Sequence, residues 1–386
     1  MTKERSVLIS GGGIAGLTLA TALGRRGIQA TVAEIKPEPS VHGVGIIQPG
    51  NALRALDSLG LLEACQAAGF QFDDFTMCEA SGASIGRIKL MRIARSYLPA
   101  LNALPRPALH QILLDAAIGA GAVVRHGLTV DGLKQAGDRV EVRLSDGTEA
   151  VYDLVVGADG IRSATRRQVF GPDHEPAFTG HGVWRFSTER PPEMDHQHMY
   201  YGVGVKAGLV PLGPTSMYLL LVTNEPDNAW MPEDRLHEIL SEKLVQFTGG
   251  FMPDVRARIR DPNDVIYQPI EEVILPTPWY RGRVLVIGDA AHASSPHVAQ
   301  GASMAIEDAI VLAELLSQEE DVATALQGFM ARRYDRCKFV QETSRAVGTD
   351  GNLDDPADCA ARNERMRRAF ATQQPRPHEA VLAAPI

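Results

Sequence analysis

Short apolar runs alternate with helical segments near both ends of the chain. Residues 6–10 (SVLIS), 28–34 (IQATVAE) and 284–287 (VLVI) are rich in β-branched residues, as expected for strands buried in a parallel sheet. The segments after the first and third runs, at 17–24 and 301–316, space their apolar residues at helical intervals. Strands followed by such helices predict an α/β fold built from βαβ units.

The middle of the chain has a different pattern. Between residues 173 and 279 prolines are frequent, aromatic residues cluster, and apolar runs are short, as in HMYYGVGV (198–205) and SMYLLLVT (216–223). One helical segment, EDRLHEILSEKLVQF, interrupts them. Short strands separated by turns predict an antiparallel sheet inserted into the α/β fold. Such a sheet is a natural floor for a second ligand.

The predicted organisation is therefore discontinuous. After residue 311 the pattern is helical, and the chain closes with a short helix and a Pro- and Ala-rich tail that is expected to fray. The expected α/β domain comprises residues 1–70, 97–172 and 280–347, the inserted sheet domain 71–96 and 173–279, and the C-terminal helix and tail 348–386.

A glycine motif stands between the first strand and the first helix. Gly11, Gly13 and Gly16 have the spacing of the dinucleotide fingerprint, and Glu34 ends the second strand. In that fingerprint the first glycine makes a tight turn, the second admits a pyrophosphate, and the third lets helix and strand pack. The acid binds a ribose hydroxyl and disfavours a 2′-phosphate, so the motif predicts the AMP half of FAD or NAD rather than NADP.

Two further strands end in a glycine followed closely by an aspartate, Asp159 and Asp289. Both acids are expected at the carboxyl edge of one sheet, where open α/β sheets bind ligands. A loop of small residues after Asp289 leads to a helix that begins at Gly301. Either acid alone is compatible with an ordinary strand–loop–helix corner. Together with a helix N-terminus, they favour a site for a polyhydroxylated, partly anionic ligand.

Composition narrows the classes of partner. The 386 residues carry a formal charge of −9, which argues against nucleic acid or an anionic membrane surface. The four cysteines show no CxxC spacing, so we expect buried thiols in a reducing compartment and no metal site. No apolar run reaches transmembrane length, and glycines interrupt the start too early for a secretory signal. We expect a cytoplasmic protein.

Three segments taken together resemble one family. GGGIAG (11–16) with Glu34, GADGIRSATRR (157–167) and GDAAHASSPHVAQGASMAIEDA (288–309) look like the signatures of the p-hydroxybenzoate hydroxylase-like, class A flavoprotein monooxygenases. The resemblance implies a Rossmann-like FAD-binding domain with an inserted antiparallel β-sheet substrate domain and C-terminal helices. It also implies noncovalent FAD, and NAD(P)H that docks transiently, because the chain has no second nucleotide fingerprint.

The resemblance also implies which residues contact the cofactor. Glu34 would hold the adenosine ribose, Arg106 the diphosphate and ribityl chain, and Asp289 the ribityl or pyrophosphate region, while Asp159 belongs to a motif linked to both FAD and NAD(P)H. Pro296 and the backbone of residues 298–302 would lie beside the isoalloxazine. The expected cofactor set is Gly11, Gly13, Ile14, Ala15, Gly16, Glu34, Arg106, Asp159, Asp289, Pro296, Ala299, Gly301 and Ala302.

The implied reaction is hydroxylation of a small phenolic or N-heteroaromatic ring. NAD(P)H reduces FAD, O2 adds at flavin C4a, and the resulting hydroperoxide delivers the hydroxyl, while the protein excludes water and orients the ring. The candidates that face the substrate are Tyr201, Tyr218, Lys206 and His297. Tyr218 could donate to a ring oxygen and Lys206 could meet a carboxylate or oxyanion. The ordinary alternatives are a core aromatic and a solvated lysine, and Trp184-Arg185 is interpreted as structural.

Two loops of small residues, Gly43-Val44-Gly45 and Ala299-Gln300-Gly301, are expected to let the flavin ring shift, so that a bound aromatic accelerates NAD(P)H oxidation. The second loop departs from the family's usual GQG, and Ser40-Val41-His42 stands where an arginine is common. Two alternatives remain open: another flavoprotein of the same fold, such as a quinone-pathway hydroxylase or an epoxidase, and a non-enzymatic FAD redox sensor. Oligomeric state is also open, with a homodimer as one option.

Overall fold

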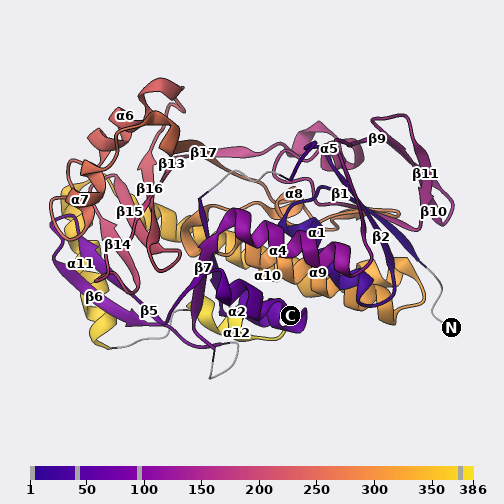
Figure 1. Cartoon of the computed structure of the whole chain (residues 1–386), viewed down its shortest axis with the longest axis horizontal. Coiled ribbons are helices and arrows are strands. Elements are labelled where there is room, and N and C mark those ends of the chain that lie inside the picture. The colour runs from indigo at the N-terminus through magenta and orange to yellow at the C-terminus, as the bar shows by residue number, and fades with distance from the viewer. Residues whose placement is uncertain (1–4, 40–43, 94–97, 373–376) are drawn as a thin grey trace.

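A six-stranded sheet forms the centre of the α/β part of the molecule (Figure 1). The computed structural model describes residues 5–39, 44–93, 98–372 and 377–386. The strands lie in the order β18 (Tyr280–Arg281), β19 (Val284–Val286), β12 (Leu154–Gly157), β1 (Ser6–Ser10), β2 (Gln29–Glu34) and β8 (Val123–His126). Neighbouring strands are parallel except for the β18–β19 pair. The predicted parallel sheet is therefore confirmed.

Both faces of this sheet are covered, which explains its continuous apolar runs. On β1, Val7 and Ile9 pack toward helices α1 (Ile14–Gly24), α4 (Arg106–Gly119), α9 (Gly301–Gln318) and α10 (Val322–Gly351). The alternate residue Leu8 packs against a three-stranded sheet of β9 (Val130–Ala136), β10 (Arg139–Leu144) and β11 (Glu149–Tyr152). Helices α1, α4 and α9 bring their N-termini to the carboxyl edge of the sheet, where the site lies, and α10 brings its C-terminal end there.

A second sheet of seven strands lies at the other end of the long axis (Figure 1). Its order is β17 (Val265–Glu272), β13 (Ala177–Glu189), β16 (Ser216–Asn224), β15 (Val205–Pro211), β14 (Gln197–Tyr201), β5 (Asp74–Glu79) and β6 (Ser84–Lys89). The predicted insertion is thus present, and β5 and β6 from the early segment join it. All pairs are antiparallel except β14–β5, which join two separate passes of the chain.

Alternation along the strands divides the second sheet into two faces. Trp184, Leu219 and Leu221 pack on one face with helices α6 (Leu236–Lys243) and α7 (Met252–Ala257). The neighbouring residues Arg185, Tyr218 and Leu220 point to the opposite face, which faces the α/β part. Helix α11 (Pro356–Ala371) packs along β6.

A small three-stranded sheet joins the two parts. It consists of β3 (Gly45–Pro49), β7 (Leu101–Pro105) and β4 (Phe70–Phe72), and short helices α2 (Gly50–Ser58) and α3 (Leu62–Ala67) lie beside it. Gly45 begins β3 and pairs with Pro105, so it is not in a loop as expected. A Cβ at Gly45 would lie 2.6 Å from the Tyr218 ring, so this glycine serves close packing. Gly43 and residues 40–42 lie outside the described residues.

The described end of the C-terminal tail, residues 377–386, does not fray as the sequence suggested. Residues 377–383 form helix α12 (Pro377–Ala383), and arginines from distant helices donate to the carbonyls at its end. Arg54 reaches Ala383 at 2.8 Å and Arg336 reaches Leu382 at 3.3 Å. These bonds satisfy carbonyls that a helix terminus leaves without intrahelical partners. Helix α10 continues to Gly351, so the expected boundary between 347 and 348 falls inside a helix.

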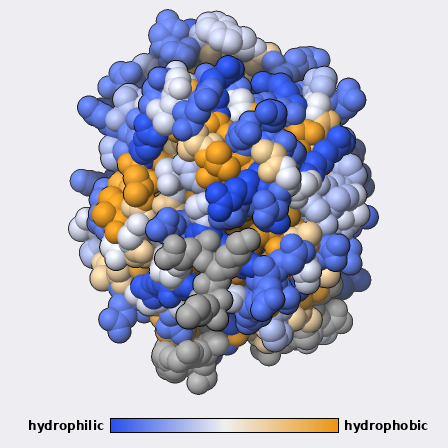
Figure 2. Space-filling model, turned by 90° about the vertical axis from the view of Figure 1, so that its right-hand side faces the viewer, coloured by the Kyte–Doolittle hydropathy of each residue, from blue (hydrophilic) through white to orange (hydrophobic). Residues whose placement is uncertain are grey.

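The face of the molecule in Figure 2 is dominated by hydrophilic residues, with hydrophobic side chains in small groups between them. All four cysteines are buried and free, as predicted. None of the helices in the described part of the chain combines the length and hydropathy that a bilayer crossing requires.

Candidate active site

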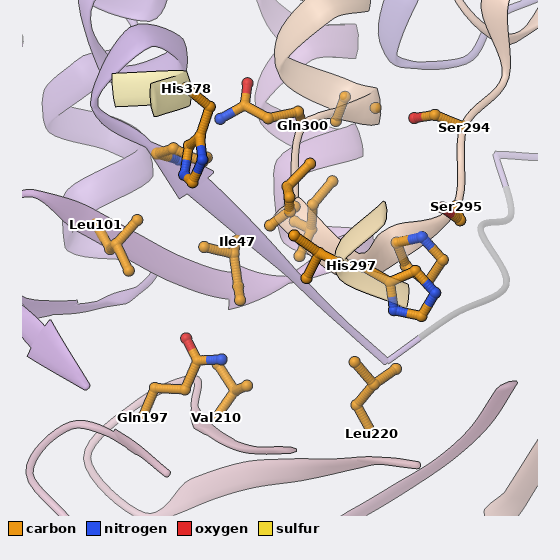
Figure 3. A pocket seen from close by; sticks show the side chains of 18 of the residues that line it. Ile47, Leu101, Gln197, Val210, Leu220, Ser294, Ser295, His297, Gln300 and His378 are labelled. Carbon is orange, nitrogen blue, oxygen red and sulfur yellow. The ribbon is translucent and has the colours of Figure 1, made fainter. Parts of the chain in front are cut away.

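A cavity of about 780 Å³ lies between the carboxyl edge of the six-stranded sheet and the inner face of the seven-stranded sheet. Figure 3 shows Gln197, Val210 and Leu220 rising from the strands, Ile47 and Leu101 on one side, and the loop from Ser294 to Gln300 across from the strands. The cavity therefore has an extended, mainly apolar floor, and the loop with the N-terminus of α9 lies opposite this floor.

The glycine motif forms a backbone cradle at one end of the cavity. A Cβ at Gly11, where φ is +108°, would lie 2.4 Å from the Ala158 carbonyl, and one at Gly16 would lie 2.0 Å from the Gly11 carbonyl. Gly13, at the N-terminus of α1, has nothing within 4 Å of a Cβ position and lines the cavity with Ile14 and Ala15. The first and third glycines thus serve packing, and the second leaves the room that a pyrophosphate needs.

Glu34 lies at the same cradle. Its carboxylate accepts a hydrogen bond from the Gly12 N–H at 2.6 Å and another from the Lys36 N–H at 3.0 Å. These bonds fix the carboxylate at the tip of β2, beside the glycine turn. This is the position that the fingerprint requires for an acid that binds a ribose hydroxyl.

Two further predicted cofactor residues border the cavity. Asp289 begins the short helix α8 (Asp289–His292), and its exposed carboxylate lies 4.0 Å from the position that a Cβ on Gly301 would occupy, where α9 begins. Arg106, the first residue of α4, is exposed and also lines the cavity. A carboxylate, a guanidinium and two helix N-termini in one place suit a ligand with hydroxyl and phosphate groups.

Asp159 is placed differently from the other predicted residues. Its carboxylate accepts hydrogen bonds from the hydroxyl of Ser163 and from the backbone and hydroxyl of Thr165, the latter two at 2.9 Å. Ser163 in turn caps helix α5 (Ala164–Phe170). The neighbours Ala158 and Gly160 line the cavity, whereas Asp159 does not. In this structure Asp159 organises the loop, and a direct cofactor contact stays a prediction.

The loop over the cavity contains a strained residue. Pro296–Val298 form a short 3-10 turn, and Ala299 then adopts a φ of +54°, a left-handed conformation that favours glycine. This residue is the one that departs from the usual GQG. Strain of this kind persists only where surrounding contacts hold it.

A buried polar network supplies those contacts. The side chain of Gln300 exchanges hydrogen bonds with Asn51 of α2, and Asn51 donates at 2.9 Å to Glu307 of α9. Glu307 receives Arg333 at 2.7 Å and Arg336 at 2.8 Å, both from α10. Burial alone would raise the pKa of Glu307, but the two guanidinium groups outweigh it and hold the pKa below its ordinary value.

The same network reaches the end of β19. Asp308 accepts the other side of the Arg333 guanidinium at 2.7 Å, the Gly288 N–H at 3.0 Å and the His292 ring at 2.6 Å. All four groups are buried. The motif that runs from Gly288 to the start of α9 is therefore tied to α10 by fully paired charges, which keeps the backbone of this motif in place.

A buried pair of ionisable side chains, Lys206 and His297, lies under the loop. Lys206 of β15 is 3% exposed, and its Nζ lies 3.0 Å from Nδ1 of His297. Burial and the charge of Arg362 lower the pKa of Lys206 to about 8, while Asp350 opposes this. Burial and Lys206 lower the pKa of His297 to about 2. At neutral pH an ammonium group therefore donates to a neutral imidazole at the cavity wall.

Helix α10 makes room for this pair. A Cβ at Gly348 would lie 2.4 Å from the His297 ring, and one at Gly351 would lie 3.1 Å from the end of Lys206. The ordinary expectation of a solvated Lys206 is therefore wrong, because the helix packs over it.

Both predicted tyrosines also line the cavity. Tyr218 is buried, and burial raises its pKa to about 12 although Arg185 opposes the rise. Among the described residues its hydroxyl has no hydrogen-bond partner. Tyr201 lies with its ring 4.8 Å from the Arg362 guanidinium.

Sequence reasoning missed three contributors to the site. Arg185 was interpreted as structural, yet it lines the cavity beside Tyr218. The signal was available, because Trp184 in the core places its neighbour on the opposite face of the strand. Asn51 and helix α12, which adds His378 and Glu379 to the lining, gave no local signal.

The fold and the cradle define an FAD-binding oxidoreductase. Residues 4–328 match the model of the FAD binding domain family (FAD_binding_3), and the chain belongs to this family of FAD-dependent aromatic monooxygenases. The family predicted from the three signatures is confirmed.

Among similar proteins, a Bacillus subtilis protein named as an FAD-dependent monooxygenase, YetM, is 35% identical over 349 residues, covering 89% of this chain and 93% of YetM. The 2-heptyl-3-hydroxy-4(1H)-quinolone synthase of Pseudomonas aeruginosa is 31% identical over 383 residues, covering 97% of each chain. The crystal structure of Klebsiella pneumoniae HpxO complexed with FAD and uric acid superimposes with a TM-score of 0.88 at 24% identity, covering 100% of this chain and 98% of HpxO. That last likeness supports the fold.

Proposed function

We propose that this protein is an NAD(P)H-dependent hydroxylase of phenolic or N-heteroaromatic substrates. The observation that carries the proposal is the buried Lys206 ammonium under the loop of residues 296–299, facing a cavity whose other polar groups include Tyr218 and Arg185. One relative is named for a quinolone, and one structural neighbour is complexed with uric acid. Both compounds are nitrogen-containing rings that carry a carbonyl oxygen, which supports a substrate of this kind.

FAD fits the structure, because the second glycine leaves open space beside a helix N-terminus and Asp289 lines the same cavity. Gly11, Gly13, Ile14, Ala15 and Gly16 would hold its pyrophosphate and Glu34 its ribose. Asp289 and Arg106 would hold the ribityl and phosphate region, and Pro296, Ala299, Gly301 and Ala302 would border its ring. When bound, FAD supplies the redox chemistry that uses electrons from NAD(P)H to activate O2.

The side chains around the substrate have three tasks. The Lys206 ammonium would stabilise an anionic ring oxygen, an interaction that strengthens in a water-poor site. Tyr218 would donate its phenolic hydrogen to the same ring, since its raised pKa keeps that hydrogen in place. Ile47, Leu101, Val210 and Leu220 would orient the ring and exclude water from it.

The test is NADH and NADPH oxidation by the purified holoenzyme against a panel of phenols and hydroxylated N-heterocycles, with mass-spectrometric analysis of the products. The expected result is a ring product with one added oxygen per NAD(P)H consumed. Peroxide release without any hydroxylated product would contradict the proposal and favour the redox sensor. An epoxide product would favour the alternative flavoprotein of the same fold. A Lys206→Met variant should keep FAD and lose most of the activity.

A further inference from the structure

The cavity changes character along the seven-stranded sheet. At the β13, β16 and β15 end its floor carries Arg185, Tyr218 and Lys206. On β14 and β5 the same face carries Tyr201 next to Lys206, then the apolar Met199, Met77 and Phe75, with Gln197 opposite Phe75. The first end of the floor can thus pair with an anionic ring oxygen, whereas the second presents mainly apolar side chains.

The apolar end is a built arm of the cavity. Phe75, Leu90 and Ala100 form a small buried cluster with Met77 and Met199 packed against it. Met366 of α11 adds a wall. Gly208, directly across from Met199, has its Cβ position only 2.8 Å from the methionine sulfur, so the absence of a side chain lets Met199 lie along the floor.

The arm is continuous with the section that would hold the ring. Leu101 of β7 packs both with the cluster around Tyr218 and Val210 and with the cluster around Phe75 and Leu90. Both clusters consist of uncharged side chains. A substrate can therefore lie with its oxygen toward Lys206 and a substituent along the methionines.

We infer that the substrate is an aromatic ring with an unbranched aliphatic substituent, and that the arm formed by Phe75, Met77, Leu90, Met199 and Met366 binds this substituent. The inference rests on the proposed function, which supplies the ring and its polar oxygen. Methionines suit such a ligand, because an unbranched thioether side chain adapts to an irregular apolar surface. A small benzoate without a chain would leave the arm unfilled.

The experiment measures dissociation constants on the FAD-loaded enzyme from the change in flavin absorbance. The probes are two series, 4-alkylphenols and 2-alkyl-4(1H)-quinolones, each with methyl, butyl and heptyl chains. In the series whose ring fits, binding should tighten about fourfold for each methylene until the arm is full, which corresponds to ~0.8 kcal/mol.

Two variants change the length of the arm in opposite directions. Met77→Trp should move the best chain length downward, and Met77→Ala should move it upward. The matched control is Val245→Trp, at an exposed position away from the cavity, which should leave the dependence on chain length unchanged. The alanine variant keeps the test usable if the tryptophan variant does not fold.

The outcomes separate the two proposals. Equal affinity across the chain lengths, or an unchanged optimum in both Met77 variants, overturns the arm. If 3-hydroxybenzoate or another chain-free phenol is hydroxylated as efficiently as any alkylated probe, the arm also fails while the hydroxylase stands. If none of the aromatic compounds is hydroxylated although FAD is bound, the proposed function fails.

Discussion

Replacing Lys206 by methionine should stabilise the protein while removing a group needed for turnover. Burial lowers the pKa of Lys206 from 10.5 to about 8, so the folded state binds this proton less tightly than the unfolded state does. At about 1.36 kcal/mol per pKa unit, keeping the ammonium in the folded protein costs about 3.4 kcal/mol well below pH 8. Methionine has a similar length and no such cost.

The pH dependence gives the sharper test. A lysine whose folded pKa is lowered makes stability rise with pH, since between about pH 8 and pH 10.5 only the unfolded chain retains the proton. The advantage of Lys206→Met should therefore shrink by about 2 kcal/mol between about pH 7 and pH 9.5. Urea unfolding at fixed FAD concentration measures this difference, with Lys89→Met, at an exposed lysine, as the control.

A stability difference between Lys206→Met and wild type that does not change over this pH range would refute the assignment of a buried, protonated lysine. The kinetics provide an independent check. If the ammonium holds an anionic ring oxygen, the KM of wild type should rise as pH passes through about 8, because the fraction of charged Lys206 falls. A KM that falls over this range would instead indicate that neutral Lys206 acts as a base.

Three further results are expected. Asp289→Ala should raise the FAD dissociation constant by about 5- to 150-fold, the loss of ~1–3 kcal/mol that follows when a charge-assisted hydrogen bond to the cofactor is removed, whereas Tyr218→Phe should spare FAD and slow turnover; equal dissociation constants for wild type and Asp289→Ala would remove Asp289 from the site. Arg333→Met should lower the free energy of unfolding by about 3–5 kcal/mol, because it leaves buried carboxylates short of a cation, while the exposed Arg368→Met changes it by less than ~1 kcal/mol in the same denaturant titration. Anaerobic rapid mixing should show flavin reduction by NADH or NADPH accelerated by a verified substrate; a rate that ignores substrate would contradict a flavin that moves in response to it.

Much of the fold was predictable because its signals are local. The β-branched runs at 6–10 and 154–157 identify buried strands by themselves. The glycine spacing forms its backbone cradle within one turn and the start of one helix, so it too can be recognised locally. The cavity face of the second sheet was also within reach, since alternation from Trp184 or Leu219 fixes the direction of every neighbour.

The remaining features depend on contacts between distant residues. The tail at 377–386 looks disordered in composition, but its carbonyls accept hydrogen bonds from Arg54, Arg332 and Arg336, and Leu382 packs into the main core. The environment of Lys206 depends on Gly348 and Gly351, more than 140 residues later in the chain. The residues around Lys206 in the sequence cannot reveal that a helix distant in the chain covers its side chain.

The 30-residue helix α10 sets a register for the whole site. Its middle holds Arg333 and Arg336 against α9, and its end places Gly348 and Gly351 over His297 and Lys206. An inserted residue between these two sections would rotate the glycines by about 100° and move them by about 1.5 Å, so that side chains would meet the pair instead. Insertions and deletions should therefore be excluded from residues 333–351 in natural or engineered variants, although this segment touches the reaction only at its last turns.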